Sequence, residues 1–160
     1  MRQMTTQRGF SLIELMVALA IAALLVKMGA PFFSDYVGNS RLREGGNLLL
    51  AETLIAQSEA VKRNTRVRVS TAGSTVQVLD MTVPATPVVL RDRTLSAGVT
   101  APTATLDFGS EGRPVPFGTS GSINLSSGSV SCSIDMRCPG LRVDAGGAIR
   151  LCGNYLSSCP

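Results

Sequence analysis

Apolar residues form an almost unbroken run near the start of the chain, from Phe10 to Phe33, and only Glu14 and Lys27 place charge within it. As an α-helix these 24 residues would measure about 36 Å, which exceeds the roughly 30 Å of a hydrocarbon core. We therefore expect a membrane-spanning helix. Lys27 lies near the end of the run, where its long stem can reach the interface. A carboxylate at mid-bilayer costs roughly 2.5–3.5 kcal/mol, so Glu14 needs a functional reason.

A helical pattern continues beyond Pro31 to about Arg63 without another proline. Its apolar positions recur at spacings of three and four and predict a broad face that packs on a sheet. The residues of this face are Leu48, Leu50, Ala51, Leu54, Ile55, Ser58 and Val61. The charged residues, Glu52 among them, are expected to point outward. Gly45 and Gly46 are expected to bend the helix without breaking it.

From Thr65 onward the pattern changes to a period of two, which is typical of half-buried strands. Two strands are expected around a turn at Ala72–Ser74, and several later segments have the same character. The expected strands are 65–70, 76–78, 88–91, 103–108, 122–125, 141–143 and 148–152. One long helix followed by short strands predicts an α+β fold, in which small antiparallel sheets lie against the helix.

The four cysteines, Cys132, Cys138, Cys152 and Cys159, all lie in the last 29 residues. Their spacings do not give the paired knuckles of structural zinc sites. A membrane-targeted chain enters an oxidising compartment, so two disulfides are favoured over a metal. Sequence alone allows three pairings. A hairpin centred near residue 145 would place Cys138 opposite Cys152, so nested bridges Cys138–Cys152 and Cys132–Cys159 are preferred over the local pairs Cys132–Cys138 and Cys152–Cys159.

Composition argues against catalysis and against a nucleic-acid function based on net charge. The formal charge is only +4, and histidine is absent. The carboxylates form no recognisable catalytic motif, and the glycine-rich segment 118–122 lacks the lysine of a phosphate loop. We expect neither an enzyme nor a bound metal or other cofactor.

The first fifteen residues contain a more specific signal. An ordinary secretory signal fits poorly, because the apolar run continues past a possible cleavage site at Ala18–Ala20 and contains a carboxylate. A plain transmembrane helix leaves that carboxylate unexplained. The processing site of type IV prepilins and pseudopilins resembles the segment Arg8-Gly9-Phe10-Ser11-Leu12-Ile13-Glu14-Leu15. The resemblance implies that a prepilin peptidase cleaves between Gly9 and Phe10, and that Phe10 is then N-methylated.

Cleavage at this site would give Glu14 a partner. It creates an α-amino group on Phe10, about one helical turn from Glu14, so a carboxylate in lipid can pair with an ammonium of its own chain or of a neighbouring subunit. Loss of one member of such a pair leaves an uncompensated charge. The resemblance therefore implies an assembly role for Glu14. It also implies a helix-kinking role for Pro31, at a position where this family commonly carries proline.

The C-terminal part extends the resemblance. The helical spine, the segment 108–113 and the hairpin 141–152 resemble the GspH/FimT group of minor pilins and pseudopilins, whose fold is type IV pilin-like. The group implies a leader at 1–9, a transmembrane half-helix at 10–33 in the bacterial inner membrane, and a periplasmic domain at 34–160. The implied function is that of a minor subunit in the tip or initiation complex of a type IV pilus or of a type II secretion pseudopilus. The implied partners are the lipid bilayer, other major and minor pilins or pseudopilins, prepilin peptidase and the inner-membrane assembly platform.

An alternative function follows from the FimT-type members, which often end in a Gly-Arg-x-Arg hairpin associated with binding incoming DNA during transformation. The corresponding residues here are Gly147-Ala148-Ile149-Arg150, so alanine replaces the first arginine. Arg142 is expected on the facing strand near Arg150 and would restore a pair of phosphate-contacting charges. Arg142 and Arg150 are the candidate DNA contacts.

Overall fold

The computed structural model describes residues 11–128, 131–157 and 159, and no side chains at 30–32. The chain divides into two compact units at the Tyr36–Val37 boundary. The helix α1 (Leu12–Arg63) has 52 residues and includes this boundary. The proposed cleavage site, Gly9–Phe10, lies outside the described residues.

The N-terminal unit consists of the first part of α1, whose described side chains are exposed. The segment Leu12–Gly29 has a mean hydropathy of 2.2 and is long and apolar enough to cross a membrane. This agrees with the apolar run expected from the sequence. Pro31 lies within α1, but its side chain is outside the described residues, so its kinking role stays a prediction.

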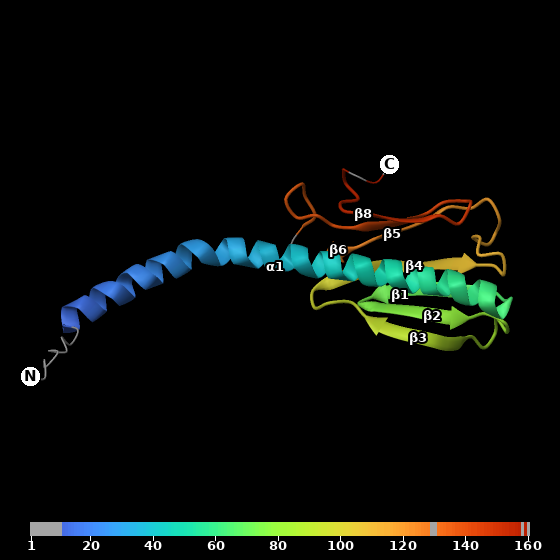
Figure 1. The fold of residues 1–160 in the computed structure, drawn as a ribbon, viewed down its shortest axis with the longest axis horizontal. Coiled ribbons are helices and arrows are strands. Elements are labelled where there is room, and N and C mark those ends of the chain that lie inside the picture. Colours follow the sequence, from blue (N-terminus) through green and yellow to red (C-terminus); the bar gives the residue numbers. More distant parts are fainter. Residues whose placement is uncertain (1–10, 129–130, 158, 160) are drawn as a thin grey trace, which may run out of the picture. The chain divides into compact units, whose positions relative to one another are not determined.

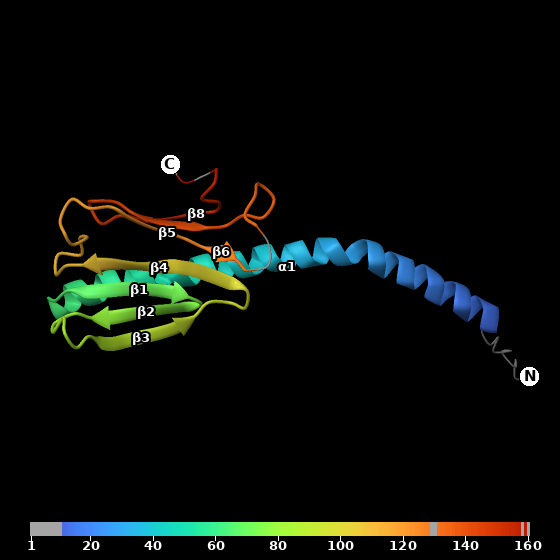
Figure 2. The same ribbon diagram turned by 180° about the vertical axis from the view of Figure 1, so that it is seen from behind.

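The C-terminal unit contains two antiparallel sheets, and Figures 1 and 2 show the second part of α1 lying against them. The larger sheet has the strand order β3-β2-β1-β4-β6, and the smaller has the order β5-β7-β8. The strands are β1 (Val67–Gly73), β2 (Thr75–Asp80), β3 (Val88–Thr94), β4 (Val99–Phe108), β5 (Gly121–Asn124), β6 (Ser126–Ser127), β7 (Gly140–Val143) and β8 (Ile149–Cys152). The predicted α+β fold is confirmed, although β6 and the first part of β4 were not predicted.

The helix ends at Arg63 through a left-handed residue. Asn64 has φ of 53°. The amide of Asn64 donates to the carbonyl of Val61 at 3.3 Å, and the amide of Thr65 donates to the carbonyl of Ala60 at 3.2 Å. These two bonds form the Schellman arrangement that satisfies the last helical carbonyls, and asparagine tolerates this conformation better than most residues.

The face of α1 that packs on the sheets differs from the predicted one. Its buried residues are Leu42, Gly45, Gly46, Leu49, Glu52, Thr53, Ala56 and Ala60. Leu54 and Val61, which were expected to pack, are 46% and 53% exposed. The prediction was wrong in the position of the buried stripe, which runs through residues 42, 46, 49, 53, 56 and 60, about 100° around the helix from the predicted stripe through 48, 51, 55 and 58. Leu48 and Leu50 of the predicted face are partly buried and do pack against the core.

Gly45 and Gly46 serve this close packing. The helix continues unbroken through both, as expected. A Cβ on Gly45 would lie 3.1 Å from Val99 Cγ1, and one on Gly46 would lie 2.9 Å from the ring of Pro139. The two glycines therefore leave room for Val99 at the start of β4 and for Pro139 just before β7.

Glu52 was expected to point outward, but it is buried with 4% exposure. Arg91 and Arg93 lie opposite Val78 and Val76 in the register of the sheet, so they share the inner face with these buried valines. Arg91 donates to both carboxylate oxygens of Glu52, at 2.7 and 3.0 Å, and Arg93 donates at 3.3 Å. These ion pairs fasten the edge strand β3 to α1.

We expect Glu52→Gln to destabilise the fold in a pH-dependent way. Hydrogen bonds from Arg91 lower the pKa of Glu52 below its ordinary value of 4.5, against the opposing effect of burial. A lowered pKa means that the carboxylate contributes stability above its unfolded-state pKa and loses it as pH falls through the folded-state pKa. Urea denaturation in detergent should show a loss of about 1–3 kcal/mol at pH 7 and a smaller loss near pH 3.

A matched control lies on β3, between the two arginines that bind Glu52. Asp92 is exposed and accepts one hydrogen bond from Gln77, so Asp92→Asn should change the unfolding free energy by no more than about 0.5 kcal/mol. An equal loss for Glu52→Gln at both pH values would show that the charge of Glu52 is not what stabilises the pair.

Candidate functional site

The described chain begins with a reciprocal helix cap. The amide of Glu14 donates to Ser11 Oγ at 3.3 Å, and the amide of Ser11 donates to Glu14 Oε2 at 3.4 Å. Both residues are exposed. This is a capping box, which occupies two amides that a helix N-terminus leaves without partners. The sequence Ser-x-x-Glu is its signature, although only a charge within the membrane segment was expected at Glu14.

The arginines of the C-terminal hairpin face each other, as expected. Arg142 on β7 pairs in register with Arg150 on β8, and Ser122 on β5 pairs with Arg142 from the other side. Leu141 and Val143 point into the core, so the alternation of the strand places Arg142 on the outer face. The outer face therefore carries a row of three donor side chains across three strands.

Hydrogen bonds fix Arg142 more firmly than Arg150. Arg142 Nη1 donates to Asn124 Oδ1 at 2.6 Å and to the carbonyl of Leu141 at 2.9 Å. Arg150 is more exposed and lies 3.6 Å from Asp144. These residues line an open groove of about 690 Å³ together with Ser120, Ser122 and the two cysteines of the second disulfide. The groove offers an anion two guanidinium groups and two serine hydroxyls, and the carboxylate of Asp144 lies beside Arg150 in its lining.

The cysteines form the local pairs, Cys132–Cys138 and Cys152–Cys159, so the preferred nested pairing was wrong. The reason is the centre of the hairpin. Gly140 lies opposite Cys152, which centres the hairpin at residue 146 instead of 145. This shift of one residue places residue 154, instead of Cys152, opposite Cys138. The amide of the neighbouring Tyr155 accordingly donates to the carbonyl of Cys138 at 2.8 Å.

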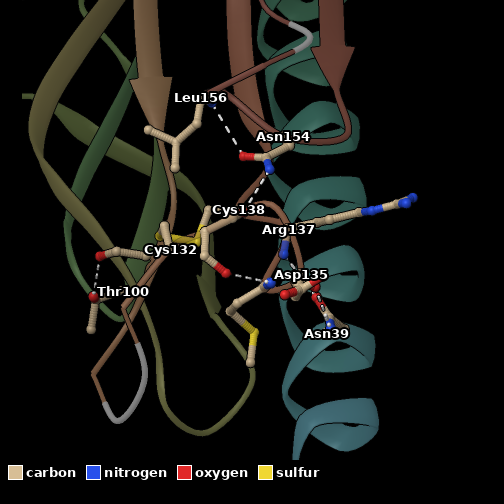
Figure 3. Close-up of a disulfide and its surroundings, with 11 residues drawn as sticks. Asn39, Thr100, Cys132, Asp135, Arg137, Cys138, Asn154 and Leu156 are labelled. Atoms are coloured by element: carbon tan, nitrogen blue, oxygen red, sulfur yellow. Dashed lines mark hydrogen bonds between the residues drawn. A yellow bond between two sulfur atoms is a disulfide. The ribbon is translucent and has the colours of Figure 1, made fainter.

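The first disulfide closes a short loop that is attached to α1 (Figure 3). Asn39 on α1 donates to the carbonyl of Asp135 at 3.1 Å and accepts from the amide of Arg137 at 2.9 Å. Met136 between them is buried and lies 3.2 Å from the position a Cβ on Gly38 would take. The side-chain amide of Asn39 therefore acts as a two-point clamp on the loop, which the sequence pattern did not indicate.

All four cysteines are in disulfides, so none offers a thiolate to a metal ion. Among the residues described by the structure, no group of three or more cysteines and carboxylates is arranged to hold a metal ion.

The chain matches two protein-family models. The model for the type II transport protein GspH matches residues 46–154, which is most of the 160-residue chain. The chain belongs to the GspH family. The model for the prokaryotic N-terminal methylation motif matches residues 4–26 of this GspH-family chain. Members of this wider family are minor pilins and pseudopilins of type IV pili or type II secretion systems, which are structural subunits that assemble with one another.

Solved structures show the same fold. The minor pilin FimU of Pseudomonas aeruginosa superposes with a TM-score of 0.59 at 20% identity, over 72% of this chain and 91% of FimU. The minor pseudopilin EpsH of Vibrio cholerae superposes with a TM-score of 0.54 at 14% identity, over 68% of this chain and 93% of EpsH. The predicted type IV pilin-like fold is confirmed.

Curated relatives are similar over a short segment. The fimbrial protein EcpC of Eikenella corrodens is 45% identical over 42 residues, which is 26% of this chain and 28% of EcpC. The type IV major alpha-pilin of Moraxella bovis is 38% identical over 53 residues, which is 32% of this chain and 33% of that pilin. The matches thus span about a third or less of these relatives.

Proposed function

We propose that the chain is a minor pilin or pseudopilin that prepilin peptidase cleaves between Gly9 and Phe10, N-methylates at Phe10, and thereby releases for assembly. Residues 1–9 are the leader in this proposal, 10–33 the inner-membrane segment and 34–160 the periplasmic domain. The subunit acts structurally rather than catalytically. It enters the tip or initiation complex of a type II secretion pseudopilus or a type IV pilus, on the inner-membrane assembly platform.

The observation that carries this proposal is the joint occurrence of the methylation motif and the Ser11–Glu14 cap at the start of an apolar helix. Before cleavage the carboxylate of Glu14 caps its own helix. Cleavage adds an ammonium on Phe10, directly before Ser11 in the sequence. The carboxylate can then pair with an amine, either its own or a neighbour's, which offsets the cost of a charge in lipid.

The N-terminus of the mature chain tests this proposal. Mass spectrometry of the protein recovered from the bacterial envelope should find N-methylated Phe10 as the first residue. A chain that keeps residues 1–9 would contradict it.

Capture of DNA is a second candidate function, favoured by the register of Arg142 with Arg150 on the outer face of the small sheet. The register gives two guanidinium groups on adjacent strands, about 5 Å apart at the backbone. Arginine binds phosphate through two parallel hydrogen bonds, and phosphate contacts fix a protein on DNA without reading its sequence. The pair takes the place of the two arginines of the Gly-Arg-x-Arg hairpin.

A double variant tests this second function. Arg142→Gln with Arg150→Gln should weaken binding of the full-length protein to duplex DNA by about tenfold or more, and should reduce the slope of log K against log salt by about 2, because each phosphate contact contributes about 0.9. Arg43→Gln on the exposed part of α1 removes a charge away from the hairpin and is the control. If the unaltered protein does not bind DNA even at low salt, this function is rejected.

A further inference from the structure

Gln57 joins α1 to two separate loops. Its side-chain amide Nε2 donates to the carbonyl of Gly112 at 2.7 Å and to the carbonyl of Gly147 at 2.8 Å. Gly112 lies in the loop between β4 and β5, and Gly147 lies in the turn between β7 and β8. One amide therefore holds together three segments that are far apart in the sequence.

The two loops approach each other closely at this point. Gly147 has φ of 91°, in the left-handed region, and a Cβ on it would lie 2.7 Å from the carbonyl oxygen of Gly112. It would also lie 3.2 Å from Gln57 Nε2. Any other residue at 147 would meet both a strained backbone and a collision. Glycine at position 147 therefore allows the turn to lie close enough to α1 for its carbonyl to accept a hydrogen bond from Gln57.

The hairpin turn is ordered within itself. Asp144 Oδ1 accepts from the amides of Gly146 and Ala148, each at 2.9 Å. The backbone of Asp144 also pairs with that of Ala148 at 3.0 Å. The turn 144–148 is thus a small rigid unit, and the bond to Gln57 fixes where this unit lies on α1.

The arginine pair depends on this turn because the strands are short. β7 and β8 pair over only four residues each, and Arg142–Arg150 is the second pair from the turn, after Val143–Ile149. Short paired strands separate most readily from an end. A turn that is released from α1 would therefore loosen Val143–Ile149 and then Arg142–Arg150. Arg150 would move more than Arg142, because β8 is an edge strand and β7 is also held by β5.

We propose that Gln57 is a positioning residue, which fixes the turn 144–148 on α1 and so holds Arg150 opposite Arg142 for a phosphate-bearing polyanion. The positioning follows from the contacts of Gln57 itself, whereas the ligand rests on the second candidate function.

Three variants separate donor chemistry from packing. Gln57→Glu keeps the size of the side chain but replaces the donor with a carboxylate, which repels both carbonyls. Gln57→Lys changes the shape but restores donors. Gln77→Glu is the matched control, because Gln77 Nε2 donates to Asp92 Oδ2 on the larger sheet, away from the hairpin.

Amide hydrogen exchange of the full-length protein in detergent measures the positioning. In Gln57→Glu the amides of Gly146, Gly147 and Ala148 should exchange about tenfold faster or more, since two hydrogen bonds are lost. Gln57→Lys should exchange at nearly the rate of the unaltered protein, and Gln77→Glu should leave these amides unchanged. Unchanged exchange in Gln57→Glu, or equally fast exchange in Gln57→Lys, would overturn the positioning role.

Binding to duplex DNA measures the functional consequence. Gln57→Glu should weaken binding several-fold while Gln57→Lys retains it. If the unaltered protein binds DNA and Gln57→Glu binds equally well, the link between Gln57 and the arginine pair is wrong. If the unaltered protein does not bind DNA, the ligand assignment fails, and the exchange rates alone decide the positioning role.

Discussion

Glu14→Ala should reduce incorporation of the subunit into filaments by about tenfold or more, while membrane insertion and cleavage remain intact. The reason is that removal of one partner from a buried ion pair typically costs about 3–5 kcal/mol. Insertion should not suffer, because alanine makes the segment more apolar. The measurement compares the amount of the chain in sheared filaments with the amount in the membrane, for the variant and the unaltered protein.

A second substitution at Glu14 distinguishes charge pairing from helix capping. Glutamine can replace glutamate in a capping box, because its oxygen still accepts from the Ser11 amide. The account therefore predicts that Glu14→Gln assembles as poorly as Glu14→Ala, and that Ser11→Ala has the smaller effect of a lost cap. Normal incorporation of Glu14→Gln would refute the pairing argument and leave capping as the role of this residue.

Phe108→Ala should destabilise the C-terminal unit by about 3–5 kcal/mol, the usual cost of removing a fully buried aromatic side chain. Phe108 is fully buried at the end of β4, opposite Val67 on β1. It also pairs with Pro114, where the chain turns back toward β5. Urea denaturation of the full-length protein in detergent measures the loss, and the steady-state amount of the chain in cells should fall with it.

The loop that follows contains a matched control for this substitution. Phe117 is 74% exposed, and its ring lies 5.5 Å from the guanidinium carbon of Arg113. Phe117→Ala deletes the same atoms, but should cost less than about 1 kcal/mol, because only an exposed cation–π contact is lost. Comparable losses for the two variants would contradict the assignment of Phe108 to the core.

The sequence predicted the features that depend on neighbouring residues. The apolar run at 10–33 and the continuation of a helical pattern after Pro31 predicted one long helix, and α1 runs from Leu12 to Arg63. Alternating residues predicted most strands, because burial on one face of a sheet imposes a period of two. The capping box at Ser11–Glu14 and the left-handed Asn64 were also encoded locally and could have been predicted from known end signals.

The errors concern features that depend on packing between distant segments. The buried face of α1 is set by what lies against it, and small residues such as Gly46 and Ala56 occupy it where the sheets come close. Glu52 is buried only because Arg91 and Arg93 on the edge strand face it. Neither the buried face of α1 nor the burial of Glu52 can be predicted from the sequence of the helix alone.

The candidate site shows the same division. The placement of Arg142 and Arg150 on adjacent strands could be predicted from a hairpin closing at residues 145–147, but their direct pairing requires the centre at residue 146. The cysteine pairing could not, because it depended on the centre of that hairpin to within one residue. The clamps made by Gln57 and Asn39 join residues 55 to 98 positions apart, and no local pattern indicates them.

The most direct test of the central claim is the intact mass of the chain recovered from the envelope of bacteria with and without prepilin peptidase. With the peptidase, the account predicts a chain that starts at Phe10 and carries one N-methyl group. Without it, the chain should keep residues 1–9 and should be absent from filaments. A chain that starts at Met1 or near Ile21 when the peptidase is present would contradict the account.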